Sequence, residues 1–270
     1  MRLIAISLIL LLSACAMPES IAVLKKLDET PMLSESLVDD RLSAVPHLDG
    51  PKITIALYNF NDKTGQRKTS ASSSLSSAVT QGAEVWVIKA LQDVGQSTWF
   101  EVVERVGLEN LIKERQLIRQ TREIYEKNGE EGPTSLQPML FAGLLLEGGV
   151  IGYDSDTAAG GAGARFLGVG ASTEYRVDTV TIVMRLVSVN TGKILMSIAT
   201  EKSIASYRSS ADVFKFIDMG RENIEIENGY SVNEPVNYAV RAAIEQGIIE
   251  LVKEGIEKNL WNYKKQGQQK

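Results

Sequence analysis

The stretch from residue 148 to residue 219 constrains the fold most, because it holds four extended runs and no helical period. Within residues 167–177, one set of alternate positions is apolar and the other set is small or charged. The run spans about 11 residues, the length that a tilted strand needs to cross the hydrocarbon of a membrane. The pattern predicts β-hairpins with one face toward lipid and the other toward an aqueous lumen.

The alternation assigns each side chain of this region to a face. The parity expected to face lipid consists of Leu167, Val169, Ala171, Tyr175 and Val177. The other set of alternate positions is expected to face the lumen and continues on the preceding extended run. It consists of Asp154, Asp156, Gly168, Gly170, Ser172, Glu174 and Arg176. Strict alternation is also typical of a half-buried soluble hairpin, so that interpretation stays open here.

After Asp178 the apolar set changes parity, to Val180, Ile182, Met184 and Leu186. The strand is therefore expected to leave lipid and enter a soluble core. A tight Gly-rich reversal is expected at Ala159–Gly163, and a turn at Asn190–Gly192. This divides the region into a first transmembrane hairpin over residues 148–178, a periplasmic sheet hairpin over 179–197 and a second transmembrane hairpin over 198–224.

Strands and amphipathic helices alternate before this region, which predicts an α/β (α+β) domain over residues 52–147. Period-two runs cover Ile53–Phe60 and Trp99–Glu104. Helical periods cover residues 79–94 and Leu108–Arg119, and a charged loop is expected over Glu123–Pro133.

The last segment, residues 225–270, is expected to carry a long helix. Asn233 is a suitable N-cap, and Pro235 falls early in the first turn. An apolar stripe from Val236 to Ile256 is wide enough to cover a sheet, and Trp261 is expected to seal the end of the helix.

The N-terminus is typical of a secretory signal: Arg2 precedes the apolar run Leu3–Leu12, and small residues stand at the cut before Cys15. Residues 1–14 resemble a bacterial lipoprotein signal, with Cys15 acylated after cleavage. By the same resemblance, the presence of Ala16 rather than an acidic residue directly after Cys15 favours sorting to the outer membrane. A secreted protein whose cysteine falls there by chance is the alternative. Residues 15–51 are polar and are interpreted as a lipidated tether or, equally, as a plain linker.

Composition argues against several classes of protein. A formal charge of −5 and a pI near 5.2, with no basic run, give no attraction for nucleic acid. The single cysteine and the single histidine, His47, allow neither a histidine-based triad nor a multi-histidine metal site. The adjacent carboxylates Asp39–Asp40 and Glu130–Glu131 are typical of solvated surface, and the glycines near residue 161 lack the spacing of a phosphate cradle. No catalytic residue, metal or cofactor is expected.

Several short motifs together resemble the curli-secretion lipoprotein family (CsgG). They include Tyr58–Asn59, Glu104–Arg105, Glu147–Gly148, Ile151–Gly152–Tyr153, Gly163–Ala164–Arg165, Phe216–Ile217–Asp218, Asn233–Glu234–Pro235–Val236 and Leu260–Trp261. The resemblance implies a periplasmic domain with two transmembrane hairpins per subunit. It also implies a nonameric ring that closes one barrel, through which unfolded amyloid subunits pass outward without ATP, helped by periplasmic and cell-surface accessory proteins.

In that family, tyrosine, asparagine and phenylalanine side chains from the loop before the first helix narrow the pore. The resemblance places Ser70, Ser74 and Leu75 at those positions, in a constriction loop over residues 67–77. Smaller side chains predict a wider or differently lined throat.

Physical reasoning adds one requirement to the resemblance. Four strands cannot close a barrel alone, and an open edge in lipid leaves peptide groups without partners, so hairpins that span the membrane require oligomerisation. The competing hypothesis is a lipid-anchored periplasmic scaffold or binding module whose hairpins stay out of the membrane. An enzyme is the third and least favoured class.

Overall fold

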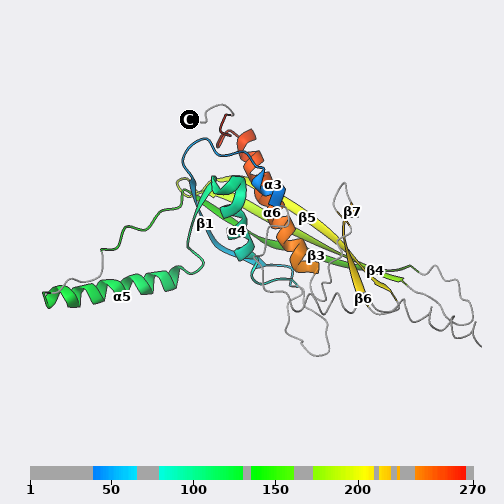
Figure 1. Cartoon of the computed structure of the whole chain (residues 1–270), viewed down its shortest axis with the longest axis horizontal. Helices are drawn as coiled ribbons and strands as arrows, with labels where there is room; N and C mark the ends of the chain where they lie inside the picture. The colour runs from blue at the N-terminus through cyan, green and yellow to red at the C-terminus, as the bar shows by residue number, and fades with distance from the viewer. Residues whose placement is uncertain are drawn as a thin grey trace, which may run out of the picture. The chain divides into compact units, whose positions relative to one another are not determined.

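The computed structural model describes residues 39–65, 79–129, 135–160, 173–209, 213–219, 224–225 and 235–265, all within one compact unit, Ser36–Lys270. Its strands are β1 (Ile53–Asp62), β2 (Phe100–Val103), β3 (Leu144–Gly160), β4 (Thr173–Ser188), β5 (Ile194–Ser209), β6 (Val213–Met219) and β7 (Ile224–Glu225). They form one seven-stranded sheet in the order β2-β1-β3-β4-β5-β6-β7 (Figure 1). The mixed α/β class that the sequence predicts is confirmed.

The sheet has a parallel part and an antiparallel part. β1 pairs in parallel with β2 on one side and with β3 on the other, whereas every pair from β3 onward is antiparallel. The parallel pair β1–β2 needs a crossover, which helix α4 (Ala83–Ser97) supplies. The antiparallel strands follow one another along the chain, as expected for successive hairpins.

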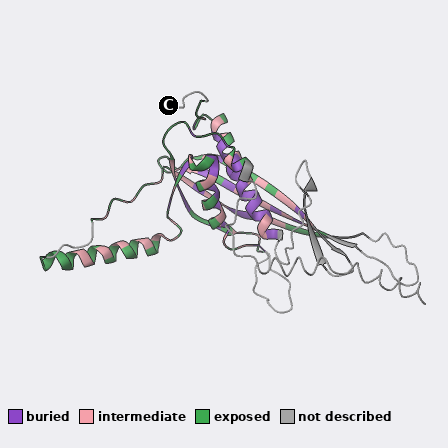
Figure 2. Ribbon diagram, viewed as in Figure 1, coloured by how far each residue is buried: buried purple, intermediate pink, exposed green. Residues whose placement is uncertain are grey.

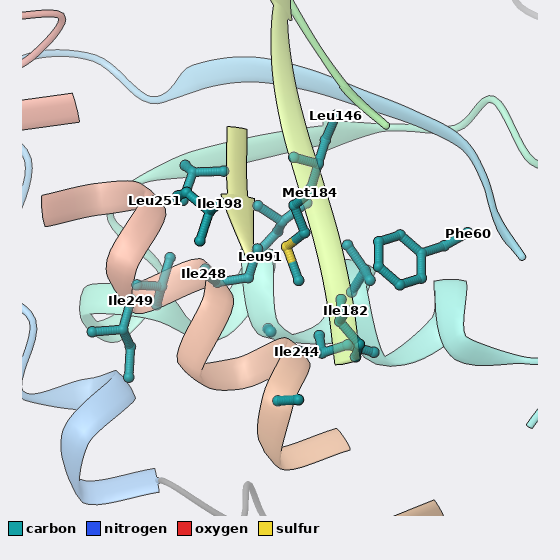
Figure 3. Packing of buried hydrophobic residues seen from close by; sticks show 14 of the residues in the cluster. Phe60, Leu91, Leu146, Ile182, Met184, Ile198, Ile244, Ile248, Ile249 and Leu251 are labelled. Carbon is teal, nitrogen blue, oxygen red and sulfur yellow. The ribbon is translucent and has the colours of Figure 1, made fainter. Parts of the chain in front are cut away.

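Helices α4 and α6 (Pro235–Glu257) cover one face of the sheet and enclose the core between them and the strands. The residues predicted from helical spacing on α4, namely Ala83, Val87, Ala90, Leu91 and Val94, are all buried. On the strand side, Ile182 and Met184 of β4 point into the same cluster (Figure 3), to which Leu186 also belongs. Each such side chain contributes about 1.5–3 kcal/mol by leaving water.

Aromatic side chains close the core at the C-terminal end of α6. The Trp261 indole N–H donates to the Val252 carbonyl at 2.9 Å, and its ring meets Trp99 edge-on with centroids 5.9 Å apart. Partial burial raises the pKa of the Tyr263 phenol, which packs on Trp99 from another side. Gly95 has φ +57°, and a Cβ there would lie 2.5 Å from the Trp99 ring, so a glycine is required. The sealing role predicted for Trp261 is confirmed.

The segment predicted as the end of the tether packs onto the domain instead. Helix α3 (Asp39–Ser43) places Leu42 in the core, and Val45 and Leu48 are buried after it. Leu48 also forms an isolated β-bridge with Tyr263. Within residues 15–51, therefore, the part from residue 39 onward is domain rather than linker.

Helix α5 (Leu108–Lys127) is longer than predicted, because Glu123–Lys127 continue the helix instead of forming a loop. None of its residues is buried, and Leu117 and Ile124 are 55% and 60% exposed. Figure 2 shows the helix coloured as exposed and intermediate along its length. The predicted amphipathic stripe exists, but within the described chain it covers no core.

The long strands confirm the change of parity predicted after Asp178 and correct one turn. Val180, Ile182, Met184 and Leu186 are buried, and the chain reverses between β4 and β5 around Gly192, which has φ +69°. The reversal predicted at Ala159–Gly163 is wrong at its start. Ala159 and Gly160 still belong to β3, paired with Glu174 and Thr173, because small residues fit an antiparallel ladder as well as a turn. Residues 161–163 lie outside the described residues.

Candidate functional site

The strands continue past the part of the sheet that the helices cover. Pairing of β1 with β3 ends at Asp62 opposite Val150. Beyond that row the sheet consists of β3, β4, β5 and β6, with the short β7 paired to the end of β6. We call this region, made of residues 151–160, 173–179, 203–209 and 213–219, the outer sheet. It coincides with the two hairpins that the sequence predicts to cross a membrane.

The strand register assigns side chains of the outer sheet to two faces, since directly opposed residues of an antiparallel pair share a face. Ser155 lies opposite Asp178, and Thr157 opposite Arg176. Asp154 lies opposite Thr179, and Asp156 opposite Val177. The prediction that Asp154 and Asp156 share the lumen-facing side with Arg176 is therefore wrong, because they share the face of Val177.

A β-bulge explains this error. The register shifts between Val150, which is opposite Ile182, and Gly152, which is opposite Thr181. One extra residue in β3 exchanges the faces of every side chain that follows it. Counting alternate positions along β3 from the buried Leu146 and Val150 thus leads to the wrong parity, and the odd-numbered residues Tyr153 and Ser155 share the face of Arg176.

A polar cluster occupies the first rows after the bulge. The Tyr153 hydroxyl donates to Asp178 Oδ1 at 2.8 Å and accepts from Arg176 Nη2 at 2.8 Å. Arg176 Nε is shared between Asp178 Oδ1 at 3.0 Å and Ser155 Oγ at 2.9 Å. We call these four residues the outer-sheet cluster. The sequence predicts Arg176 as a lumen residue, but it reveals neither the cluster nor the carboxylate of Asp178, because the contacts depend on the register.

Asp178 is the buried member of this cluster. Its side chain is 1% exposed, whereas that of Arg176 is 44% exposed. Its second carboxylate oxygen, Oδ2, has no hydrogen-bond partner in the described part of the chain. A buried charge costs free energy unless it is paired, and here the guanidinium and the phenol pair with one oxygen only.

The outer sheet has two open edges among the described residues. On β3, the side that β1 occupies up to Val150 carries no further strand from residue 151 to residue 160. On β6, only Asp218 and Met219 pair with β7, so residues 213–217 are open on that side. Unpaired strand edges of this length are sites at which another strand adds.

The other predicted site residues are placed only partly. Glu174 and Tyr175 belong to β4, opposite Ala159 and Ala158, and these positions put Glu174 on the face of Arg176 and Tyr175 on the face of Val177. The remaining predicted site residues lie outside the described part of the chain: Cys15, Ser70, Ser74, Leu75, Leu167, Gly168, Val169, Gly170, Ala171 and Ser172.

The described residues include no group of three or more potential metal ligands among His, Cys, Asp and Glu. His47 contacts the Gln96 amide oxygen through Nε2 at 3.3 Å, at the surface. Among the helices of the described part, none combines the length and apolarity needed to cross a bilayer.

Comparison with known proteins gives the family. The model of the family described as curli production assembly/transport component CsgG matches residues 41–270. The chain belongs to the CsgG family. CsgG proteins of Salmonella typhimurium and Escherichia coli strain K12 are each 43% identical to it over 221 residues, which cover 80% of this chain and 77% of theirs. CsgG of Citrobacter koseri has the same identity and coverage. The chain is thus grouped with transport components.

Proposed function

We propose that this CsgG-family chain is an outer-membrane lipoprotein whose copies form an oligomeric channel. The channel secretes unfolded amyloid subunits of the curli type from the periplasm to the cell surface by diffusion, without ATP. Membership of a family of curli assembly and transport components carries the proposal. The outer sheet supplies the physical means, because its length and open edges suit a strand-by-strand barrel.

The directions of the edge strands support ring closure. β3, β4, β5 and β6 are successively antiparallel, so β3 and β6 run in opposite directions. When β6 of one copy meets β3 of the next, the new pair is again antiparallel, and the same contact repeats around a ring. Closure satisfies the edge peptide groups, which in lipid would each cost several kcal/mol. A nonamer is the stoichiometry that we adopt from the family resemblance.

The face assignment supports one position for the membrane boundary. Arg176 and Glu174 share a face, which we assign to the lumen, and Val177 and Tyr175 share the other, which we assign to lipid. Asp156 lies on that lipid side. Charged residues on the lipid face cost little near the interface but several kcal/mol at the bilayer midplane. We therefore place the start of the hydrocarbon beyond the row of Asp156 and Val177.

Helix α5 gives an additional reason for assembly. Ile112, Leu117, Ile124 and Tyr125 expose between 39% and 60% of their surface along this helix, and Phe141, on the segment that returns from it, is 87% exposed. Apolar surface gathered along one element is typical of a protein interface. A chain that acts alone would leave it in water.

Electron microscopy of detergent-extracted protein, combined with planar-bilayer recording, tests the proposal. We expect ring-shaped particles with a central pore and stepwise conductance. Export should also be restored when the chain replaces a CsgG protein in curli-producing cells. A single non-conducting subunit would instead establish the lipid-anchored scaffold, and a nucleotide requirement in purified vesicles would contradict transport by diffusion.

Replacement of the acylated cysteine, Cys15→Ser, is expected to move the chain from the outer-membrane fraction to the soluble periplasmic fraction. Two or more acyl chains each bury many methylenes at about 0.8 kcal/mol apiece, so attachment is effectively permanent while they are present. Fractionation followed by immunoblotting measures the change. Ser13→Ala is the control, because it keeps a small residue before the cut. Unchanged membrane attachment of Cys15→Ser would show that lipid is not the anchor.

The constriction is tested by enlarging its side chains. The double substitution Ser70→Tyr with Leu75→Phe is expected to lower single-channel conductance, because aromatic side chains narrow the throat. Thr69→Ser, a conservative change beside the proposed throat position, is the control. Equal conductance for the double variant and the wild type would remove these residues from the throat.

A further inference from the structure

The first hairpin of the outer sheet has little in its sequence that specifies how its two strands align. Beyond the bulge, β3 carries mostly small residues, among them Ser155, Thr157, Ala158, Ala159 and Gly160. Among the described residues, β3 past Val150 is paired on one side only, by β4. Strands with small side chains and no apolar face of their own are prone to slip in register.

The outer-sheet cluster lies where this problem begins. Ser155 is directly opposite Asp178, Tyr153 is one row toward the core, and Arg176 is one row outward. The four hydrogen bonds among them all link β3 to β4, apart from the one between Arg176 and Asp178 within β4. A slip of one residue would carry Tyr153 and Ser155 to the opposite face and break every cross-strand contact.

The energetics of Asp178 argue against a role in stability alone. Its carboxylate is buried, but one oxygen lacks a partner in the described chain. Buried ion pairs seldom stabilise a fold relative to apolar residues of similar size, and their best attested use is to specify register. A neighbouring apolar side chain, Val180, occupies the next position of the same face, so the sheet accommodates apolar residues at this level.

We propose that Tyr153, Arg176 and Asp178 form a register lock that aligns β3 with β4 across the bulge. The lock positions the first hairpin so that the open edge of β3 presents the correct face to the next copy. This inference rests on the proposed channel for its biological purpose, but the alignment itself is a property of one chain. The three are positioning residues and contact no transported segment in this role.

Cysteine cross-linking in the full chain reads the register directly. Cys15 is the only native cysteine. A pair introduced at Asp156 and Val177, which are directly opposed, reports the native alignment, and a pair at positions 157 and 177, which are one residue out of register, reports a one-residue slip. A disulfide requires Cβ atoms about 3.5–4.5 Å apart, which direct opposition approaches and positions on opposite faces do not. With the cluster intact we expect the native pair to cross-link about tenfold more than the slipped pair.

Two variants test the lock. Tyr153→Phe removes one hydroxyl at constant shape, and Arg176→Gln removes the guanidinium. Each is expected to raise the slipped cross-link severalfold and to lower the fraction of ring-sized particles. The control is Arg185→Gln, which breaks the pair between Arg185 and Glu147 on the same two strands, where the residues are 51% and 40% exposed. It is expected to change neither readout.

The outcomes separate this inference from the proposed function. An unchanged cross-linking ratio in both Tyr153→Phe and Arg176→Gln overturns the lock, whether or not the wild type conducts. If the wild type forms no conducting ring but the slipped cross-link rises in the variants, the proposed channel is overturned and the register lock still holds. An equal rise in Arg185→Gln would show that any loss on these strands causes slippage, which also overturns the lock.

Discussion

Arg241→Met is expected to lower the free energy of unfolding by about 3 kcal/mol, because it removes the charge partner of a buried carboxylate on α6. Arg241 Nε donates to Glu245 Oε1 at 2.9 Å, and the two side chains are 8% and 4% exposed. The guanidinium carbon also lies 4.4 Å from the centre of the Trp86 ring, which joins α6 to α4. Urea denaturation of the unacylated Cys15→Ser chain measures the loss.

A matched pair on the same helix serves as the control. Lys258 and Glu254 have the same spacing of four residues, but their side chains are 46% and 33% exposed. Lys258→Met is expected to change the free energy of unfolding by less than about 0.5 kcal/mol, since exposed pairs are screened by water. The double variant Arg241→Met with Glu245→Leu should recover most of the loss. Equal effects at the two pairs would contradict the burial argument.

Gly148→Ala is expected to cost about 3 kcal/mol of folding free energy, at the upper end of what overpacking a core produces. Gly148 lies in β3 between Phe60 of β1 and Met184 of β4, and a Cβ there would stand 2.3 Å from the Val183 carbonyl oxygen and 2.5 Å from the Phe60 ring. Phe60 is itself fully buried, so it has no free volume into which to move. Thermal unfolding of the unacylated chain gives the shift.

The control for this substitution is a glycine on the same segment with room beside it. At Gly143, just before β3, the nearest atom to an added Cβ is Thr54 Oγ1 at 3.7 Å, an ordinary van der Waals contact. Gly143→Ala should leave the midpoint of unfolding nearly unchanged. If Gly148→Ala were equally harmless, β3 and Phe60 would have to separate more easily than their packing indicates.

The two faces of the outer sheet show where prediction from sequence ends. The alternation around residue 175 correctly predicts that Tyr175 and Val177 share one face and Glu174 and Arg176 the other, because both pairs lie within one uninterrupted strand. The same counting fails for Asp154 and Asp156. They belong to another strand, and a bulge between Val150 and Gly152 separates them from the buried residues that fix the parity.

Helix α5 illustrates a second limit. Its helical period is visible in the sequence from Leu108 onward, and the structure confirms a helix. Periodicity predicts that one side is apolar, but not what covers that side. On α4 the equivalent stripe packs into the core, whereas on α5 no residue is buried.

The order of apolar and polar residues along single segments predicts the signal-like N-terminus, most of the helices and strands, and the buried set on β4. The motifs also indicate the family. Packing and register show in addition that residues 39–51 join the domain, that a bulge exchanges the faces of β3, and that Tyr153, Arg176 and Asp178 meet. These features depend on register and packing between segments distant in the chain, which local periodicity does not encode.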